Sequence, residues 1–199
     1  LAVGATATGL AVALSVACLE QEVQRQPTFS GRSLWLLYLP LLVPQVGFLF
    51  GIQVVLAWSG LDGGWMALIW THLLFVLPYV FLSLSDPWRA FDPRYAQTAL
   101  ALGASPARAF WRIKLPMLRG SLAVAAAVGF AVSVAQYLPT LFAGAGRFAT
   151  LTTEAVTLAS GANRRIIGVY AVAQTALPLL GFALALWLSQ RRKPSDALR

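Results

Sequence analysis

The sequence predicts an all-α protein, a polytopic membrane bundle of about five transmembrane helices. Of its 199 residues, 58% are hydrophobic and 11% charged, and the mean hydropathy is +0.71. In a typical soluble domain about a quarter of the residues are charged. A helix needs about 20 apolar residues to cross the hydrocarbon core, and the candidate stretches are 1–19, 34–58, 65–84, 120–140 and 166–190. They lack the two-residue alternation of a barrel strand, so each is expected to be helical.

The first stretch, 1–19, opens without a methionine and without a basic segment before it. We therefore expect a membrane span of a longer protein and not a cleaved signal peptide. Cys18 is the only cysteine and has no partner for a disulfide or a metal site, so it is predicted to be a small core residue. No cofactor and no metal are expected.

The second stretch, 34–58, contains Pro40 and Pro44, which predict a kink. Gly47 and Gly51 are four residues apart, as on a close-packing helix face. Polar residues inside spans are costly, so they mark either a translocation pathway or bridges between helices. The pathway candidates are Gln45, Gln53, His72, Gln136, Tyr137 and Gln174.

The third stretch, 65–84, contains His72, the only histidine. A catalytic or metal-binding role would need companions, and no Asp, Glu or Cys falls at ligand spacing on that helix. Two interpretations of His72 stay open. It either lines a pathway or forms hydrogen bonds to a neighbouring helix.

Residues 85–119 form a basic loop in which two short helices are predicted. Asp92-Pro93 is a helix-start signal, with an acceptor at N-cap and a proline at N1. Gly103 is the matching stop, because glycine takes the left-handed C′ position at least cost. The first helix has a small apolar face with a spacing of i, i+4 and i+7. That face consists of Tyr95, Ala99 and Leu102.

A second short helix is predicted to start at Ser105-Pro106 and to end where Pro116 breaks it. It carries Arg108, Arg112 and Lys114. Taken alone, these features fit two kinds of segment. The loop is either a docking surface for another protein or an ordinary loop that its arginines hold at the lipid headgroups.

The basic residues predict the orientation of the chain. Loops 20–33 and 85–119 and the tail 191–199 would share one side of the membrane, and they contain 12 of the 15 lysines and arginines. That side is expected to be cytoplasmic, with the N-terminal end of the chain outside and the C-terminus inside. This bias explains the net charge of +8 better than a nucleic-acid-binding patch does.

The segment 140–165, on the outer side, is long and rich in glycine and threonine. Gly144-Ala145-Gly146 predicts a turn, and Thr152-Thr153-Glu154 is expected to begin a short helix on or in the membrane surface. A plain solvated loop is the alternative for this segment.

The spacing within the basic loop resembles the signature of permease subunits in binding-protein-dependent ABC importers. That signature is E-A-A, three residues, G, nine residues, I-x-L-P, and it falls on Gln97-Thr98-Ala99, Gly103, Ile113 and Leu115-Pro116. Only the last residue of E-A-A is kept, and the loss of the acid weakens any charged contact at that point. The match covers the loop and fits the span layout of nearly the whole chain.

The resemblance implies a type I ABC importer permease fold over residues 1–199, with a cytoplasmic coupling loop at 85–119. The first loop helix would sit in a groove of a cytoplasmic ABC ATPase dimer. The ATPase-coupling residues would be Gln97, Thr98, Ala99, Leu102, Gly103, Ser105, Pro106, Arg108, Ile113, Leu115 and Pro116.

Further partners implied by the resemblance are a periplasmic or extracellular solute-binding protein and a second permease half in the bacterial inner membrane. The sequence from Gln136 to Arg165 looks like the C-terminal half of a duplicated thiamine- or iron-type permease. The second half would then lie upstream or be a separate subunit. The implied binding-protein contacts are Arg147, Glu154, Asn163, Arg164 and Arg165.

Transport in such a permease is implied to proceed by alternating access, driven by ATP hydrolysis in the partner. The chain has no G-x-x-x-x-G-K-[ST] loop, and no catalytic residue is predicted. An ion-coupled secondary transporter is the alternative class, and His72 is its only candidate coupling group. An intramembrane enzyme would need a nucleophile with a base or a metal pair, and those residues are missing.

Overall fold

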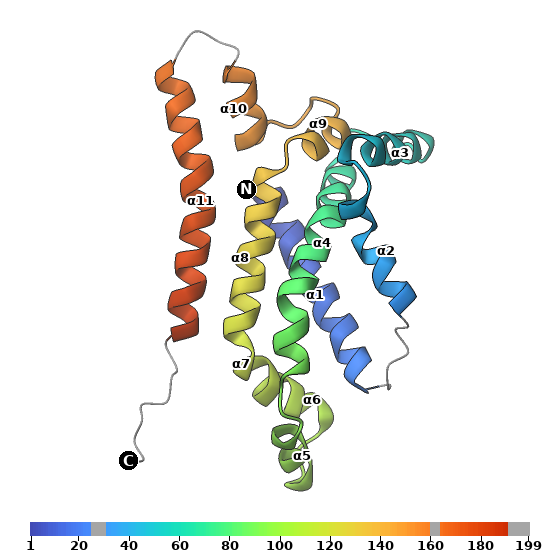
Figure 1. The fold of residues 1–199 in the computed structure, drawn as a ribbon, viewed down its shortest axis with the longest axis vertical. Helices are drawn as coiled ribbons and strands as arrows, with labels where there is room; N and C mark the ends of the chain where they lie inside the picture. The colour runs from blue at the N-terminus through green and yellow to red at the C-terminus, as the bar shows by residue number, and fades with distance from the viewer. Residues whose placement is uncertain (25–30, 160–163, 191–199) are drawn as a thin grey trace.

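The computed structural model describes residues 1–24, 31–159 and 164–190. Within these ranges the regular structure is entirely helical, which confirms the predicted all-α class (Figure 1). Four long helices run lengthwise: α1 (Ala2–Gln24), α4 (Trp65–Arg89), α8 (Arg119–Ala135) and α11 (Arg164–Gln190).

Shorter helices complete the bundle. The helix α2 (Gly31–Leu42) packs against α4, and α3 (Gln45–Trp58) packs against α9 (Leu138–Gly144). At one end are α5 (Arg94–Ala101), α6 (Pro106–Ala109), the π-helical turn η1 (Phe110–Lys114) and α7 (Leu115–Met117). At the other end are α9 (Leu138–Gly144) and α10 (Leu151–Ala159).

The hydrophobic core lies between α1, α4 and α8. Leu19, Val80 and Trp88 are among its fully buried side chains. The three helices lie close together at Gly129 of α8, where a Cβ atom would lie 2.6 Å from Cγ2 of Val80 and 3.1 Å from Cγ2 of Thr8. A larger residue at this position would force the helices apart. Cys18 is exposed on α1, so the prediction that it is a core residue was wrong.

In the part of the chain that the structure describes, three helices are long and apolar enough to cross a membrane: Ala2–Val23, Trp65–Arg89 and Arg165–Ser189. Two bent helix pairs, Trp35–Leu42 with Gln45–Trp58 and Pro106–Met117 with Arg119–Ala135, bring the number to as many as five if each pair is one span. The predicted number of spans is therefore reached only by counting both pairs.

The prediction of one span over 34–58 needs correction, because α2 and α3 meet at 112°. Pro44 precedes α3 with an extended ψ of 124°. It has no N–H with which to continue the hydrogen bonding of α2, so the predicted proline kink becomes a sharp corner. The predicted close packing at Gly47 and Gly51 is not made in the described part of the chain, where a Cβ atom at either position would meet nothing within 4 Å.

The prediction of a fourth span over 120–140 also needs correction. The helix α8 ends at Ala135, Gln136 has an extended backbone with ψ of 106°, and α9 is a separate helix. Pro139, near the start of α9, cannot donate a backbone hydrogen bond to the last turn of α8. The chain therefore turns here, and Pro139 and Thr140 are buried in α9.

The outer segment has the turn and the short helix that its sequence predicts. Ala145 and Gly146 have φ values of 47° and 72°, and α10 begins at Leu151, one residue before the expected start. Thr150 and Thr153 cap this helix, since Oγ1 of Thr153 accepts a hydrogen bond from the Thr150 N–H at 2.8 Å. The hydroxyl of Thr152 donates to the carbonyl of Val134, which attaches α10 to α8.

Candidate functional site

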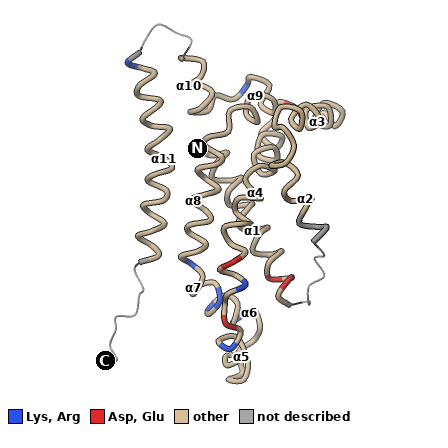
Figure 2. The backbone as a smooth tube through the Cα atoms, viewed as in Figure 1, with Lys and Arg blue, Asp and Glu red and all other residues tan. Residues whose placement is uncertain are grey.

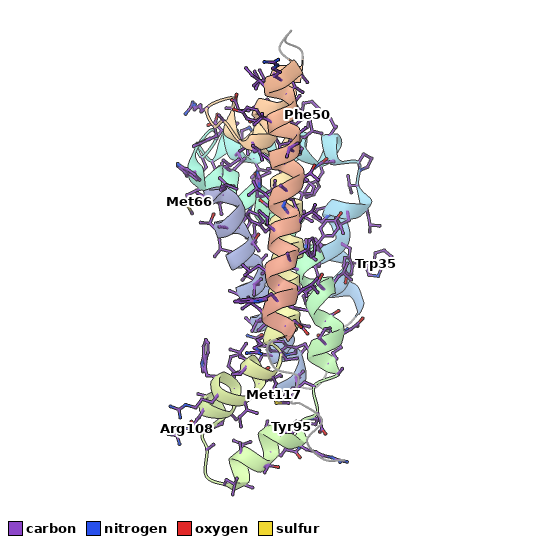
Figure 3. The ribbon with its side chains drawn as sticks, turned by 90° about the vertical axis from the view of Figure 1, so that its left-hand side faces the viewer. Trp35, Phe50, Met66, Tyr95, Arg108 and Met117 are labelled. Carbon is purple, nitrogen blue, oxygen red and sulfur yellow. The ribbon has the colours of Figure 1, made fainter. Side chains whose placement is uncertain are left out.

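The basic loop extends beyond one end of the bundle, with Tyr95 and Arg108 on its surface (Figure 3). Its first helix, α5, starts close to the predicted position, because Oδ1 of Asp92 accepts a hydrogen bond from the Arg94 N–H at 2.9 Å. Gly103 follows the helix with φ of +85°, and a Cβ atom there would meet no atom within 4 Å. The requirement for glycine is therefore one of backbone conformation and not of space.

The exposed part of α5 is the surface that this loop presents to solvent or to a partner. Gln97 and Thr98 are exposed, and the side chain of Leu102 is 83% exposed. Ala99 is buried, and Tyr95 is exposed. The predicted apolar face of Tyr95, Ala99 and Leu102 is thus divided, with only its central residue packed inside.

The second helix of the loop begins as predicted. Oγ of Ser105 accepts a hydrogen bond from the Arg108 N–H at 3.3 Å, and Pro106 is the first residue of α6. The exposed Pro116 does not break the helix, which continues through η1 and α7 to Met117. In η1 the N–H of Leu115 donates to the carbonyl of Phe110, five residues earlier. This wider turn relieves the clash that a proline ring makes in an α-helix.

Two residues of the predicted coupling set are partly buried in η1 and α7. Ile113 is half-buried in η1. Leu115 packs against the hydrophobic core between α1, α4 and α8. The second half of the loop is therefore anchored on the core through Leu115, whereas α5 is mostly exposed.

Lys114 is the main polar attachment of the loop to the bundle. Its Nζ lies 2.6 Å from Oε2 of Glu20 on α1, and its side chain is only 7% exposed. The same ammonium lies 4.7 Å from the ring centre of Trp88 and 5.5 Å from that of Phe91. A buried lysine needs such a partner, so Glu20 and the two rings fix the position of η1.

A second ion pair lies beside the first. Arg89 at the end of α4 makes two hydrogen bonds of 3.2 Å to the carboxylate of Glu22. The sequence analysis named Lys114 only as a basic residue of the second loop helix, and it did not select Glu20 or Glu22. The sequence feature that could have indicated this pairing is that two of the seven acidic residues, Glu20 and Glu22, lie together at the end of an apolar stretch. The loop at 85–119 supplies basic residues with which they can pair.

An apolar cavity of about 440 Å³ lies between the loop and the bundle. Trp88, Phe91 and Phe110 contribute aromatic walls, and Ala96 and Leu100 of α5 close the opposite side. The described charges gather mainly at this end of the molecule (Figure 2).

The polar candidates of the spans meet partly in one buried group. Nδ1 of His72 lies 2.8 Å from Oγ of Ser133 on α8, and its Nε2 lies 2.9 Å from Oγ1 of Thr140 on α9. Nε2 of Gln136 donates to the His72 carbonyl at 3.5 Å. His72 therefore joins three helices, which is the second of its two predicted interpretations.

A cavity of about 440 Å³ at the corner between α2 and α3 is lined by Gln45 and Gln136, together with Phe75 and Tyr79. Tyr137 is half-buried and directly precedes α9. Gln53 and Gln174 lie on α3 and α11, outside the lining of this cavity. The structure therefore brings three of the six pathway candidates, Gln45, His72 and Gln136, into one region.

The candidate contacts of the outer segment lie at the end of the bundle opposite the loop (Figures 1 and 2). Arg147 is exposed, and its guanidinium lies against the turn at Gly63. Glu154 is in the first turn of α10, and Arg165 is exposed at the start of α11. Asn163 and the side chain of Arg164 lie outside the described residues.

Comparison with known proteins identifies the type of chain that has this loop. Residues 8–193 match the family described as binding-protein-dependent transport system inner membrane component. The chain belongs to this family. Its members are permease components of ABC transporters in the inner membrane, and the loop described above is the segment that carries the family-like signature.

Three relatives differ in how similar they are to this chain and in how much of it they match. The inner membrane ABC transporter permease protein YnjC of Escherichia coli K12 is 44% identical over 184 residues, which are 92% of this chain and 35% of YnjC. The spermidine/putrescine permease PotC of the same strain is 25% identical over 60% of this chain and 44% of PotC. The molybdenum permease ModB of Mycobacterium tuberculosis H37Rv is 30% identical over 59% of this chain and 49% of ModB.

The chain spans about a third to a half of the length of these relatives.

Proposed function

We propose that this chain is a membrane-spanning part of an ABC importer permease that translocates a small solute delivered by a binding protein. ATP hydrolysis takes place in separate ATPase subunits. The observation that carries this proposal is the loop of residues 92–116. It extends from the bundle, presents the exposed residues of α5 and is anchored in the core by its second half.

In this proposal α5 is the helix that enters a groove of the ATPase. Gln97, Thr98 and Leu102 make contact through their exposed side chains. Ala99 supports the helix from inside. The loop with η1 and α7 then transmits the movement of the ATPase to α8 and, through Lys114 and Glu20, to α1.

The solute passes a second permease half and the polar region around Gln45 and Gln136. Arg147, Glu154 and Arg165 are proposed to meet the binding protein at the opposite end of the bundle. The loop end is proposed to be cytoplasmic, with the N-terminal end of the chain outside. PotC and ModB are named for different solutes, so membership supports the class of transport and leaves the solute open. A duplicated permease with this chain as its C-terminal half stays a prediction.

The proposal is tested by two substitutions at Gly103 in the complete permease, expressed with its ATPase. Gly103→Val places a β-branched residue at φ of +85° and strains the backbone by about 1–3 kcal/mol. Gly103→Asn is the matched control, because asparagine tolerates the left-handed region.

The expected result is that wild type and Gly103→Asn copurify with the ATPase and show ATP hydrolysis stimulated by the binding protein. Gly103→Val should lose the stimulation while the permease itself still folds. If the wild-type permease binds no ATPase, the proposal fails. Equal stimulation in both variants would show that the conformation of the loop is irrelevant to coupling.

A further inference from the structure

A second cavity, of about 600 Å³, lies where α7 and α8 join and where the end of α11 packs against them. It is separate from the apolar cavity behind the loop, and its lining is much more polar. Arg112 and Arg119 line it together with Ser121 and Ser189. Among the described residues, its lining contains no acidic side chain.

The two arginines of this cavity differ from the other cations at the same end of the bundle. Lys114 and Arg89 are paired with Glu20 and Glu22. In the described residues no ion pair is recorded for Arg112 or Arg119, and Nη2 of Arg119 is buried without a hydrogen-bond partner. A buried guanidinium nitrogen without an acceptor costs free energy, and an acceptor bound in this cavity would remove that cost.

The backbone adds to the same preference. The 17-residue helix α8 begins at Arg119, and Leu118 before it supplies no side-chain cap. The first N–H groups of a helix attract anions. Gly120 lies at this start, and a Cβ atom there would be 2.8 Å from Oγ of Ser189. Glycine therefore lets α11 bring a hydroxyl close to the first turn of α8.

We propose that this cavity binds a phosphate group, with Arg112 and Arg119 as its charged ligands and Ser121 and Ser189 as hydrogen-bond donors. Guanidinium groups suit phosphate because their donors match two of its oxygens at once. The phosphate belongs either to a lipid headgroup or to a free phosphate ion. The volume is within the range of small-molecule sites in proteins.

The experiment uses the full permease purified in detergent or reconstituted in nanodiscs. One arm titrates inorganic phosphate by calorimetry in detergent. The other arm measures, by native mass spectrometry, the phosphatidylglycerol retained from nanodiscs that contain phosphatidylglycerol and phosphatidylcholine. Wild type is compared with Arg112→Gln and Arg119→Gln. Arg94→Gln is the control, since it removes an exposed arginine of α5 outside this cavity.

Wild type is expected to bind one phosphate group per chain in one of the two arms, and the responding arm identifies the source. Each cavity variant should weaken binding about tenfold or more, as expected for a charge-assisted hydrogen bond, and Arg94→Gln should not. Arg112 is exposed, so its variant tests the site even if Arg119→Gln fails to fold. Binding in neither arm overturns the proposal. An equal loss in Arg94→Gln, or no loss in Arg112→Gln, overturns it as well.

Discussion

Lys114 and Glu20 form an ion pair in which each charge offsets the free-energy cost of burying the other. The pair joins the loop to α1 across 94 positions of sequence, with side chains 7% and 20% exposed. Removing one member leaves a charge without its partner, whereas removing both leaves only a polar or apolar contact. The position of the loop therefore depends on both residues.

This dependence gives a double-mutant prediction. Glu20→Gln should destabilise the permease by about 1–3 kcal/mol, because the ammonium of Lys114 then lacks its carboxylate. Lys114→Met should cost less, since its unbranched side chain still packs on Trp88 and Phe91. Adding Lys114→Met to Glu20→Gln should restore part of the loss. Thermal unfolding of the detergent-solubilised permease measures all three, and additive effects would contradict the coupling.

His72 is predicted to be a structural contact between helices and not a proton-coupling group. His72→Leu leaves the Ser133 hydroxyl without its recorded partner and should lower stability by about 1–3 kcal/mol. His72→Gln keeps a side chain able to form hydrogen bonds and should retain stimulated ATP hydrolysis in the assembled complex. If His72→Gln folds normally and transport then stops, the ion-coupled alternative regains support.

At the scale of helices, Gly129 sets how closely α1, α4 and α8 pack. Gly129→Val should lower the unfolding temperature strongly or prevent folding, because even its Cβ would overlap Cγ2 of Val80 at 2.6 Å. Gly9→Ala on α1 is the matched control, since no atom lies within 4 Å of its added Cβ. That variant should be neutral or slightly stabilising. Similar behaviour of the two variants in thermal unfolding would show that the close approach at Gly129 is not needed.

Hydropathy predicted which segments are helical, but not where each helix turns. Pro40 and Pro44 predicted a kink. The angle of 112° between α2 and α3, however, depends on how α3 packs after Pro44. Similarly, the end of α8 at Ala135 goes with a buried contact between Gln136 and the carbonyl of His72. Such contacts join residues more than 60 positions apart, and no local pattern reports them.

The loop was predicted more fully than the spans because its signals are local. Asp92, Ser105 and Gly103 act through their own backbone conformation or that of near neighbours, so their roles follow from the sequence. The sequence predicted that the second loop helix ends at Pro116. This was wrong because the π turn before Pro116 makes room for the proline ring, so the helix continues. The ion pair of Lys114 was missed because its partner is on α1.

For the whole molecule, the two ends of the bundle are expected to lie on opposite sides of the membrane. The prediction is tested in a Cys18→Ser background, because Cys18 is exposed. Arg108→Cys on the loop should react with a membrane-impermeant maleimide only in inside-out vesicles. Asp62→Cys, in the exposed turn between α3 and α4, should react only in intact spheroplasts. Labelling of both from the same side would contradict the proposed topology.

The bundle leaves large apolar surfaces uncovered, most clearly on α11. In the membrane-length part of this helix only 6% of the residues are buried, and its main contacts are with α8 and α10. Lipid or the second permease half is expected to cover the rest. The helix α11 also forms one wall of the proposed phosphate site, so changes at its end would alter that site without disturbing the central core.

The number of residues in the π turn at Phe110–Lys114 sets the direction in which the loop extends from the bundle. A π turn contains one residue more than an α turn, and each residue of a helix advances the chain by about 100° of rotation. Deleting one residue from this turn would leave its composition almost unchanged, but it would rotate everything before it relative to α8. A partner that binds the loop would then meet a different face of α5. The rotation of the loop relative to the bundle therefore depends on the number of residues in the π turn as much as on which residues they are.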